Sequence, residues 1–184
     1  ACKEANTAQH LSDVMAGTES GNRMNLETFV QRNYMEKILC DANRRFRDMS
    51  NGQFELKLIN VEDAGEGKNK GLDLEVYSIV TGKTRSVNTL SGGESFMAAL
   101  SLALGMADQI QAATAAIHLD VMFIDEGFGS LSDNARNEAV NILKEMAGKQ
   151  RQIGIISHVS ELKDEIENQL IVKKDDRGSH ISWR

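Results

Sequence analysis

One strand–helix–strand segment in the second half of the chain constrains the fold most. The apolar runs HLDVMFIDE (118–126) and RQIGIISH (151–158) are typical of buried strands, and a helix is predicted between them over about Asp133–Ala147. Because a single crossover is right-handed in nearly all proteins, the two strands should be parallel neighbours or near neighbours. The acids and the histidine that end these runs should then meet at the sheet edge where open parallel sheets bind ligands.

These side chains are of the types that suit a magnesium–phosphate site. We expect Asp125 to hold Mg²⁺ directly or through water, because magnesium binds few carboxylates and keeps several waters. Glu126 is the candidate base that orients and deprotonates an attacking water, and His158 the candidate donor to a terminal phosphate. Taken separately, the acids also fit a solvated strand end and the histidine an ordinary core or loop position; their convergence favours function.

A second motif lies in the stretch NTLSGGESFMAAL (88–100). Ser91 and Glu94 have the spacing of a helix capping box, which explains both residues without any ligand. It does not explain Gly92 and Gly93, since each glycine costs about 1 kcal/mol in a helix relative to alanine. The pair is explained if a phosphate approaches the backbone amides of the first helical turn, with the Ser91 hydroxyl on the same phosphate.

A phosphate loop, which a nucleoside triphosphate site usually also needs, is not found. Gly82, Lys83 and Thr84 could end the pattern G-x-x-x-x-G-K-[ST], but Tyr77 stands where its first glycine belongs and a strand is predicted to follow. The glycine-rich segment GEGKNKG (65–71) fails in the same way. Both segments are predicted to be hairpin turns, so the chain has a magnesium acid, a base, a phosphate-sensing histidine and a glycine motif without a phosphate cradle.

The remaining pattern predicts an α/β fold with a largely parallel sheet flanked by helices. Average usage predicts roughly nine prolines, yet there are none, which favours long helices. Three further strands precede the glycine motif and two close the chain. The other predicted helices are residues 1–16, a long helix from Leu26, an apolar helix over 96–107 and ELKDEIEN. The other predicted strands are QFELKLIN, GLDLEVYSIV, TRSV, QLIVKK and SHISWR.

Charge and composition exclude several classes of protein. The net charge of −6 is not that of a general nucleic-acid binder. No stretch of about 18 apolar residues predicts a membrane span, and no secretory signal is visible. Cys2 and Cys40 fit no metal spacing and indicate reduced thiols in a cytoplasmic protein. The start without methionine suggests a piece of a longer protein.

In this order, the motifs resemble the C-terminal lobe of the SMC-type ABC ATPases. LSGGE is similar to the ABC signature, VMFIDE to Walker B with its catalytic glutamate, GSLSD to the D-loop and ISH to the switch histidine. Within this family the chain resembles the SbcC-type exonuclease subunits. The similarity extends upstream to NLETFVQRNYMEKILCDANRRFRDMSNGQFEL and covers most of residues 24–174.

The resemblance implies a function that this chain performs only with others. It implies ATP and Mg²⁺ as cofactors, an N-terminal Walker A lobe of the same protein, and a coiled coil whose end is residues 1–16, with the head lobe at 17–184. Ser91, Gly92, Gly93 and Glu94 would reach ATP held by a second head in an ATP-dependent homodimer. Further implied partners are an SbcD-type nuclease and double-stranded DNA ends, with no membrane.

One motif departs from the family pattern. The D-loop roles would fall to Ser130 and Leu131, but Ser132 stands where the family usually has aspartate, and Asp133 follows. Ser132 is expected to cap the next helix. Whether Asp133 makes the contact across the dimer is left open.

Three alternative functions stay open at this point. An ABC transporter ATPase commonly has proline after the catalytic glutamate, whereas Gly127 stands here. A non-hydrolysing DNA-end scaffold would need neither Glu126 nor His158. Another SMC-type repair or chromosome-organising ATPase would differ in the residues before this segment. Direct DNA binding by the cluster Arg44, Arg45 and Arg47 is less favoured than a solvated helix face.

Overall fold

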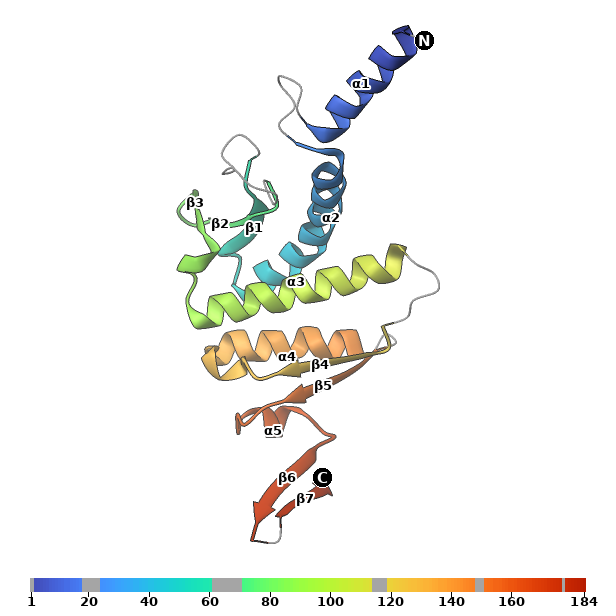
Figure 1. Cartoon of the computed structure of the whole chain (residues 1–184). Helices are drawn as coiled ribbons and strands as arrows, with labels where there is room; N and C mark the ends of the chain where they lie inside the picture. Colours follow the sequence, from blue (N-terminus) through green and yellow to red (C-terminus); the bar gives the residue numbers. More distant parts are fainter. Residues whose placement is uncertain (1, 18–23, 61–70, 114–118, 148–150, 177) are drawn as a thin grey trace. The chain divides into compact units, whose positions relative to one another are not determined.

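A computed structural model describes residues 2–17, 24–60, 71–113, 119–147, 151–176 and 178–184. The chain forms two compact units, Ala1–His118 and Leu119–Arg184. Figure 1 shows the elements of each unit in chain order. Each unit is considered by itself below.

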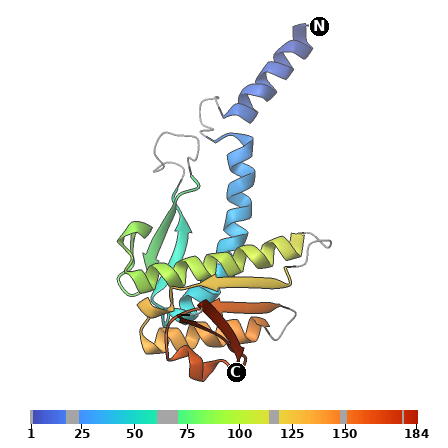
Figure 2. The same ribbon diagram turned by 60° about the horizontal axis from the view of Figure 1, so that its bottom comes forward.

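The first unit contains two long helices beside a small antiparallel sheet (Figures 1 and 2). Its elements are α1 (Cys2–Ala16), α2 (Leu26–Met49), β1 (Phe54–Leu58), β2 (Leu74–Ser78), β3 (Lys83–Ser86), the 3₁₀ turn η1 (Val87–Thr89) and α3 (Gly92–Ala113). The strand order is β1-β2-β3. Phe46, Val76 and Leu104 have no exposed surface, and they bring α2, the sheet and α3 into one core.

Polar side chains of α2 fix the helix to its neighbours. The Asn43 amide donates to the Leu56 carbonyl at 2.8 Å, and its oxygen accepts from the Leu56 N–H at 2.7 Å, so α2 is hydrogen-bonded to the backbone of β1. Arg45 forms an ion pair with Asp108 of α3, and Arg47 pairs with Glu55 at 2.7 Å. Two of the three arginines considered for DNA binding are therefore engaged within the protein.

Helix α3 is the one described helix with the length and hydropathy of a membrane span. Its buried residues include Met97, Leu100 and Leu104, and it packs extensively against α2. The core helix of a globular unit passes the same test of length and composition, and α3 is such a helix.

The crossing of α2 and α3 depends on Gly105. A methyl group at this position would lie 2.7 Å from the Ile38 carbonyl oxygen and 3.1 Å from the Ala42 Cβ. Because backbone atoms cannot move aside cheaply, we expect Gly105→Ala to destabilise the protein by roughly 1 kcal/mol or more, the overpacking cost exceeding the gain in helix propensity. Urea denaturation measures the change. The control is Ala103→Ser on the exposed side of α3, and an equal midpoint for both variants would contradict the close packing.

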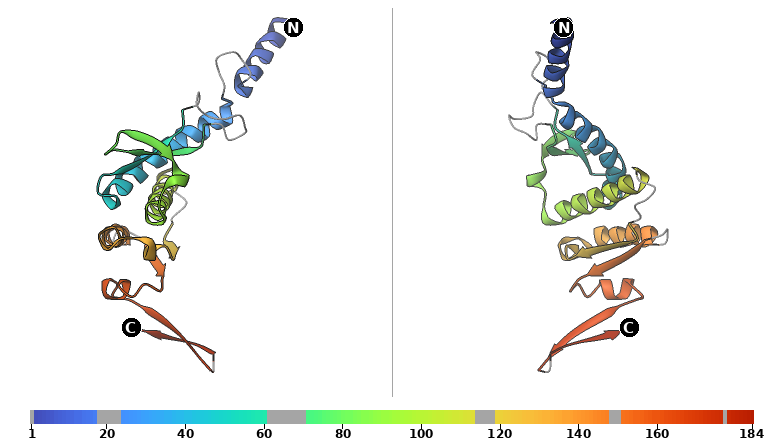
Figure 3. Two further views of the ribbon diagram at one scale, coloured as in Figure 1. Left: turned by 90° about the vertical axis from the view of Figure 1, so that its left-hand side faces the viewer. Right: turned by 45° about the vertical axis from the view of Figure 1, so that its right-hand side comes forward.

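The second unit contains the predicted strand–helix–strand segment. It consists of β4 (Val121–Asp125), the 3₁₀ turn η2 (Phe128–Ser130), α4 (Asp133–Ala147), β5 (Gln152–Ile156), α5 (Leu162–Glu165), β6 (Leu170–Asp175) and β7 (Gly178–Trp183). Strands β4 and β5 pair in parallel with Val121 opposite Gln152 and Asp125 opposite Ile156, as predicted. Helix α4 runs beside this pair in Figures 1 and 3.

The predicted α/β class is confirmed, with a narrower parallel part than the sequence suggested. Among the described strands only β4 and β5 are parallel, whereas β1–β3 and the β6–β7 hairpin are antiparallel. The apolar runs predicted strands buried on both faces. One face of the β4–β5 pair is instead exposed, with Val121 52%, Phe123 72% and Ile156 55% accessible.

The proposed division at residue 16 stays a prediction. Helix α1 matches the expected bounds, and its apolar side chains Leu11 and Met15 are exposed. Exposed apolar side chains at this spacing are compatible with a coiled-coil partner helix. The boundary that the structure itself marks lies between His118 and Leu119.

Candidate functional site

Glu126 and His158 meet at the carboxyl end of the parallel pair. The Nδ1 of His158 lies 2.8 Å from Oε2 of Glu126, and both side chains are accessible to solvent, 81% for His158 and 48% for Glu126. Glu126 directly follows β4, and His158 comes two residues after β5. The convergence expected from the right-handed crossover is thus present, and it joins a carboxylate to an imidazole in one hydrogen bond.

The backbone of Glu126 has an unusual conformation. Its φ is +59°, in the left-handed region that non-glycine residues seldom adopt, and Gly127 follows at +99°. The Glu126 N–H donates to the Ile156 carbonyl at 2.9 Å, which ties this turn to the end of β5. Such strain, of order 1–3 kcal/mol, tends to persist where a side chain must point in one direction for function.

Asp125 is the last residue of β4, and it is exposed beside Glu126. No group of three or more metal-ligating side chains occurs among the residues that the structure describes. A single aspartate nevertheless fits Mg²⁺, since this ion is usually held by one or two carboxylates together with substrate phosphates and water. The donor set therefore fits a magnesium ion that arrives with a nucleotide.

The glycine motif forms the predicted capping box at the start of α3. The Ser91 N–H donates to Oε2 of Glu94 at 2.8 Å, and the Glu94 N–H donates to Ser91 Oγ at 3.3 Å. Because the Ser91 oxygen serves as an acceptor here, its hydroxyl proton can still donate to a ligand. Ser91 and Gly92 are exposed, and first-turn amides have no acceptor inside their own helix. Capping and phosphate binding are thus compatible at this helix start.

Arg85, a residue that the sequence did not single out, contacts this motif. Its Nη2 lies 3.3 Å from Oε2 of Glu94, and its Nη1 donates to the Thr89 carbonyl at 2.7 Å. Burial raises the pKa of Glu94, but hydrogen bonds from the Ser91 backbone and from Arg85 outweigh this effect and lower the pKa below its ordinary value. Glu94 therefore carries its negative charge at neutral pH.

The D-loop segment has one buried and one exposed member. Leu131 is buried, with 6% of its surface exposed, while exposed Ser130 donates its hydroxyl to the Gly127 carbonyl at 2.8 Å. Ser132 accepts from the Ala135 N–H at 3.4 Å and caps α4, as expected. Asp133 pairs with Arg136 at 2.8 Å. The D-loop roles of Ser130 and Leu131 remain predictions.

The segment with Gly82, Lys83 and Thr84 is not a phosphate loop. Gly82 has φ +65° and donates to the Ser78 carbonyl at 2.8 Å, which closes the turn between antiparallel β2 and β3. The hairpin prediction is confirmed there. The GEGKNKG prediction concerns residues 65–71, of which 65–70 lie outside the described residues.

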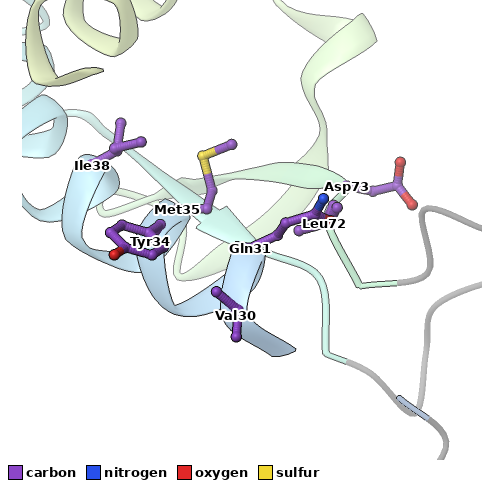
Figure 4. A pocket seen from close by; sticks show the side chains of 7 residues that line it. All are labelled: Val30, Gln31, Tyr34, Met35, Ile38, Leu72 and Asp73. Carbon is purple, nitrogen blue, oxygen red and sulfur yellow. The ribbon is translucent and has the colours of Figure 1, made fainter. Parts of the chain in front are cut away.

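A hollow of about 500 Å³ lies between α2 and the chain that enters β2 (Figure 4). Its lining is mainly apolar, and its residues are Val30, Gln31, Tyr34, Met35, Ile38, Leu72 and Asp73. Among the residues that the structure describes, the lining of this hollow includes no basic side chain that could bind a phosphate.

Comparisons with known proteins agree with these motifs. Residues 69–145 match the family model described as SbcC/RAD50-like, Walker B motif. The chain is 45% identical over 172 residues to the SbcC subunit of the nuclease SbcCD from Vibrio cholerae, a match that covers 93% of this chain and 17% of that protein. The chain is also 41% identical over 169 residues to the SbcC subunit of the same nuclease from Lactococcus lactis. This match covers 89% of this chain and 16% of that protein.

Solved structures of SMC ATPases share the fold. One, from work on ATP-driven dimerization and DNA stimulated activation of SMC ATPases, has a TM-score of 0.63 at 21% identity and covers 85% of this chain and 89% of its own. The Smc head of Pyrococcus furiosus bound to the C-terminal domain of ScpA has a TM-score of 0.61 at 18% identity, covering 85% and 37%.

Sequence and fold therefore agree on the relationship. The chain spans about a sixth of the length of the SbcC proteins that it matches. The matched family model includes LSGGE, the strand that ends at Asp125, and Glu126, which follows that strand. This chain belongs to the SbcC/RAD50-like family.

Proposed function

We propose that this chain is the C-terminal lobe of an ATP-driven head that acts on DNA double-strand ends together with a nuclease. The observation that carries the proposal is the 2.8 Å contact of Glu126 with His158 at the carboxyl ends of β4 and β5. Hydrolysis of a nucleotide needs a base for water and a donor for the terminal phosphate, and these two residues supply both.

In this proposal Glu126 orients the attacking water and accepts its proton. If the imidazole of His158 is protonated, Nδ1–H stays on Glu126 while Nε2–H donates to the terminal phosphate. Asp125 holds Mg²⁺, which when bound offsets charge on the phosphates. The contribution of the base to the rate is about 10²–10⁴-fold.

The glycine motif serves a nucleotide held by another head. Ser91 donates its hydroxyl and the first-turn amides of Gly92 and Gly93 donate their N–H groups to the γ-phosphate. ATP binding thereby joins two heads in a homodimer, and hydrolysis releases them. The nucleotide itself is cradled by a Walker A lobe of the same protein, which the motifs of this chain do not supply.

The open face of the β4–β5 pair supports a place for that lobe. Val121, Phe123 and Ile156 are all more than half exposed on a parallel pair, although parallel sheets are normally covered on both faces. The Walker A lobe is the proposed cover.

The remaining partners follow from the relatives. Those relatives are named as the SbcC subunit of the nuclease SbcCD, so the proposed partners of this chain are an SbcD-type nuclease and double-stranded DNA ends. The proposed location is the cytoplasm, where the DNA and ATP are found.

The half-site character gives the direct test. We expect the chain alone to hydrolyse ATP negligibly, because it lacks a phosphate cradle, and a separately expressed Walker A lobe to restore magnesium-dependent turnover. Release of phosphate is measured for each lobe alone and for the mixture. Robust turnover by this chain alone, with contaminants excluded, would contradict the half-site proposal, and a mixture that binds ATP without any turnover would favour a non-hydrolysing scaffold.

A further inference from the structure

One guanidinium connects three segments around the glycine motif. Arg85 lies on β3, where Nη1 donates to the Thr89 carbonyl at 2.7 Å and to the Thr89 hydroxyl at 3.2 Å. Its Nη2 donates to Oε2 of Glu94 at 3.3 Å, and the guanidinium lies 5.4 Å from the centre of the Phe54 ring. Strand, turn and helix start are therefore held by a single side chain.

The carboxylate that Arg85 contacts has two opposing effects. Its Oε2 accepts from the Ser91 N–H at 2.8 Å, which fixes the helix start. Its negative charge also lies within the first turn of α3, where the exposed Ser91 and Gly92 would have to receive an anion. The negative charge of Glu94 would repel such an anion, and a cation that contacts the same carboxylate offsets the repulsion.

We propose that Arg85 is a positioning residue for the signature motif, which fixes the Thr89–Glu94 turn and offsets the charge of Glu94 so that a γ-phosphate can approach Ser91, Gly92 and Gly93. The inference rests on the proposed function. It adds a role that depends on the charge at position 94, besides the hydrogen bonds from Arg85 to Thr89, which do not depend on that charge.

A double-mutant cycle with Glu94→Gln separates the two roles. Glutamine can replace glutamate in a capping box, so the helix start keeps its geometry without the charge. In heads reconstituted with the Walker A lobe, Arg85→Ala should lower turnover and ATP-driven dimerisation by about tenfold when Glu94 is present, as expected for a lost charge-assisted hydrogen bond. In the Glu94→Gln background the same change should cost about threefold or less.

Two further variants make the test decisive. Arg85→Lys keeps a charge without the fork that reaches both Thr89 and Glu94, and it should have intermediate activity even if Arg85→Ala folds poorly. Lys83→Ala removes an exposed cation from the same strand and should leave turnover unchanged. Monomeric ATP binding should be equal in all variants, since the signature acts on the partner's nucleotide.

The outcomes distinguish this inference from the proposed function. Equal costs of Arg85→Ala in both backgrounds, or equal losses for the lysine and alanine variants with both folded by circular dichroism, would overturn the positioning role alone. A parent head whose turnover does not depend on Glu126 would overturn the proposed function and this inference with it. A cost confined to the Glu94 background, reduced by added salt, supports the inference.

Discussion

Glu126→Gln is expected to lower the ATP turnover of reconstituted heads by about 10²–10⁴-fold, the contribution of a general base. Nucleotide binding should be nearly unaffected, because the change leaves size and hydrogen-bonding reach the same. Heads that bind ATP but cannot hydrolyse it should accumulate as a dimer. Phosphate release and light scattering measure the two effects.

The local contacts of Glu126 should be preserved in the Glu126→Gln variant. The Nδ1 of His158 lies 2.8 Å from Oε2 of Glu126, and a glutamine side-chain oxygen can accept a hydrogen bond from the same nitrogen. The Glu126 N–H keeps its bond to the Ile156 carbonyl, which holds the left-handed turn. The variant therefore removes proton acceptance while it keeps the local geometry.

The matched control is Glu145→Gln, on the exposed side of α4. It removes the same charge from the same unit and should leave turnover within about twofold. Unchanged turnover in Glu126→Gln would remove this residue from the role of base. Loss of ATP binding in the same variant would indicate a structural defect instead.

Local rules were enough to predict much of the fold and part of the site. Hydrophobic periodicity predicted α2 and α4 within a few residues, and the crossover rule predicted that Glu126 and His158 converge. The spacing of Ser91 and Glu94 predicted the capping box. These features depend on residues close in sequence or on one right-handed crossover connection. A single sequence is therefore enough to predict them.

Contacts between distant residues were not predictable in this way. Arg45 was grouped with its neighbours as a possible DNA contact, but its partner Asp108 lies 63 positions along the chain. Arg85 gave no signal, because its contacts with the Phe54 ring and with Glu94 arise only once β3 is folded against them. Pairing of long charged side chains is set by tertiary packing, which a single sequence does not reveal.

The extent of the parallel sheet was overestimated for a related reason. The apolar run of β4 predicted burial on both faces, yet Val121 and Phe123 are exposed. Where Phe123 lies over Gly154, the ring comes within 2.6 Å of the position a Cβ would occupy, so an aromatic ring covers a bare strand position. A run of apolar residues in a strand predicts that both faces of the strand are buried, but it does not identify the segment that buries each face.

Ser91→Arg is expected to abolish ATP-driven dimerisation and turnover in a homodimer of reconstituted heads. A large cation would stand where the γ-phosphate of the partner head must approach. ATP binding by the single head should persist, because Asp125 and the Walker A lobe are unchanged. Loss of the cap costs about 1 kcal/mol of stability, so Ser91→Asn, which retains an N-cap side chain, is the control for folding.

Mixing Ser91→Arg heads with Glu126→Gln heads tests whether the motif acts across the dimer. A mixed dimer has two composite sites. One combines the intact Glu126 of the first head with the intact Ser91 of the second, and the other site carries both lesions. Activity above that of either variant alone is therefore expected, although partial, because the damaged site weakens the dimer.

The interpretation depends on proof that heads exchange, which differently tagged heads at high concentration can provide. If exchange occurs and activity equals the sum of the separate variants, then either the two sites are fully cooperative or Ser91 acts on the nucleotide of its own head. Cross-linking from position 91 to a labelled nucleotide decides between these two. Label on the partner's nucleotide supports the contact across the dimer, whereas label on the nucleotide of its own head would overturn it.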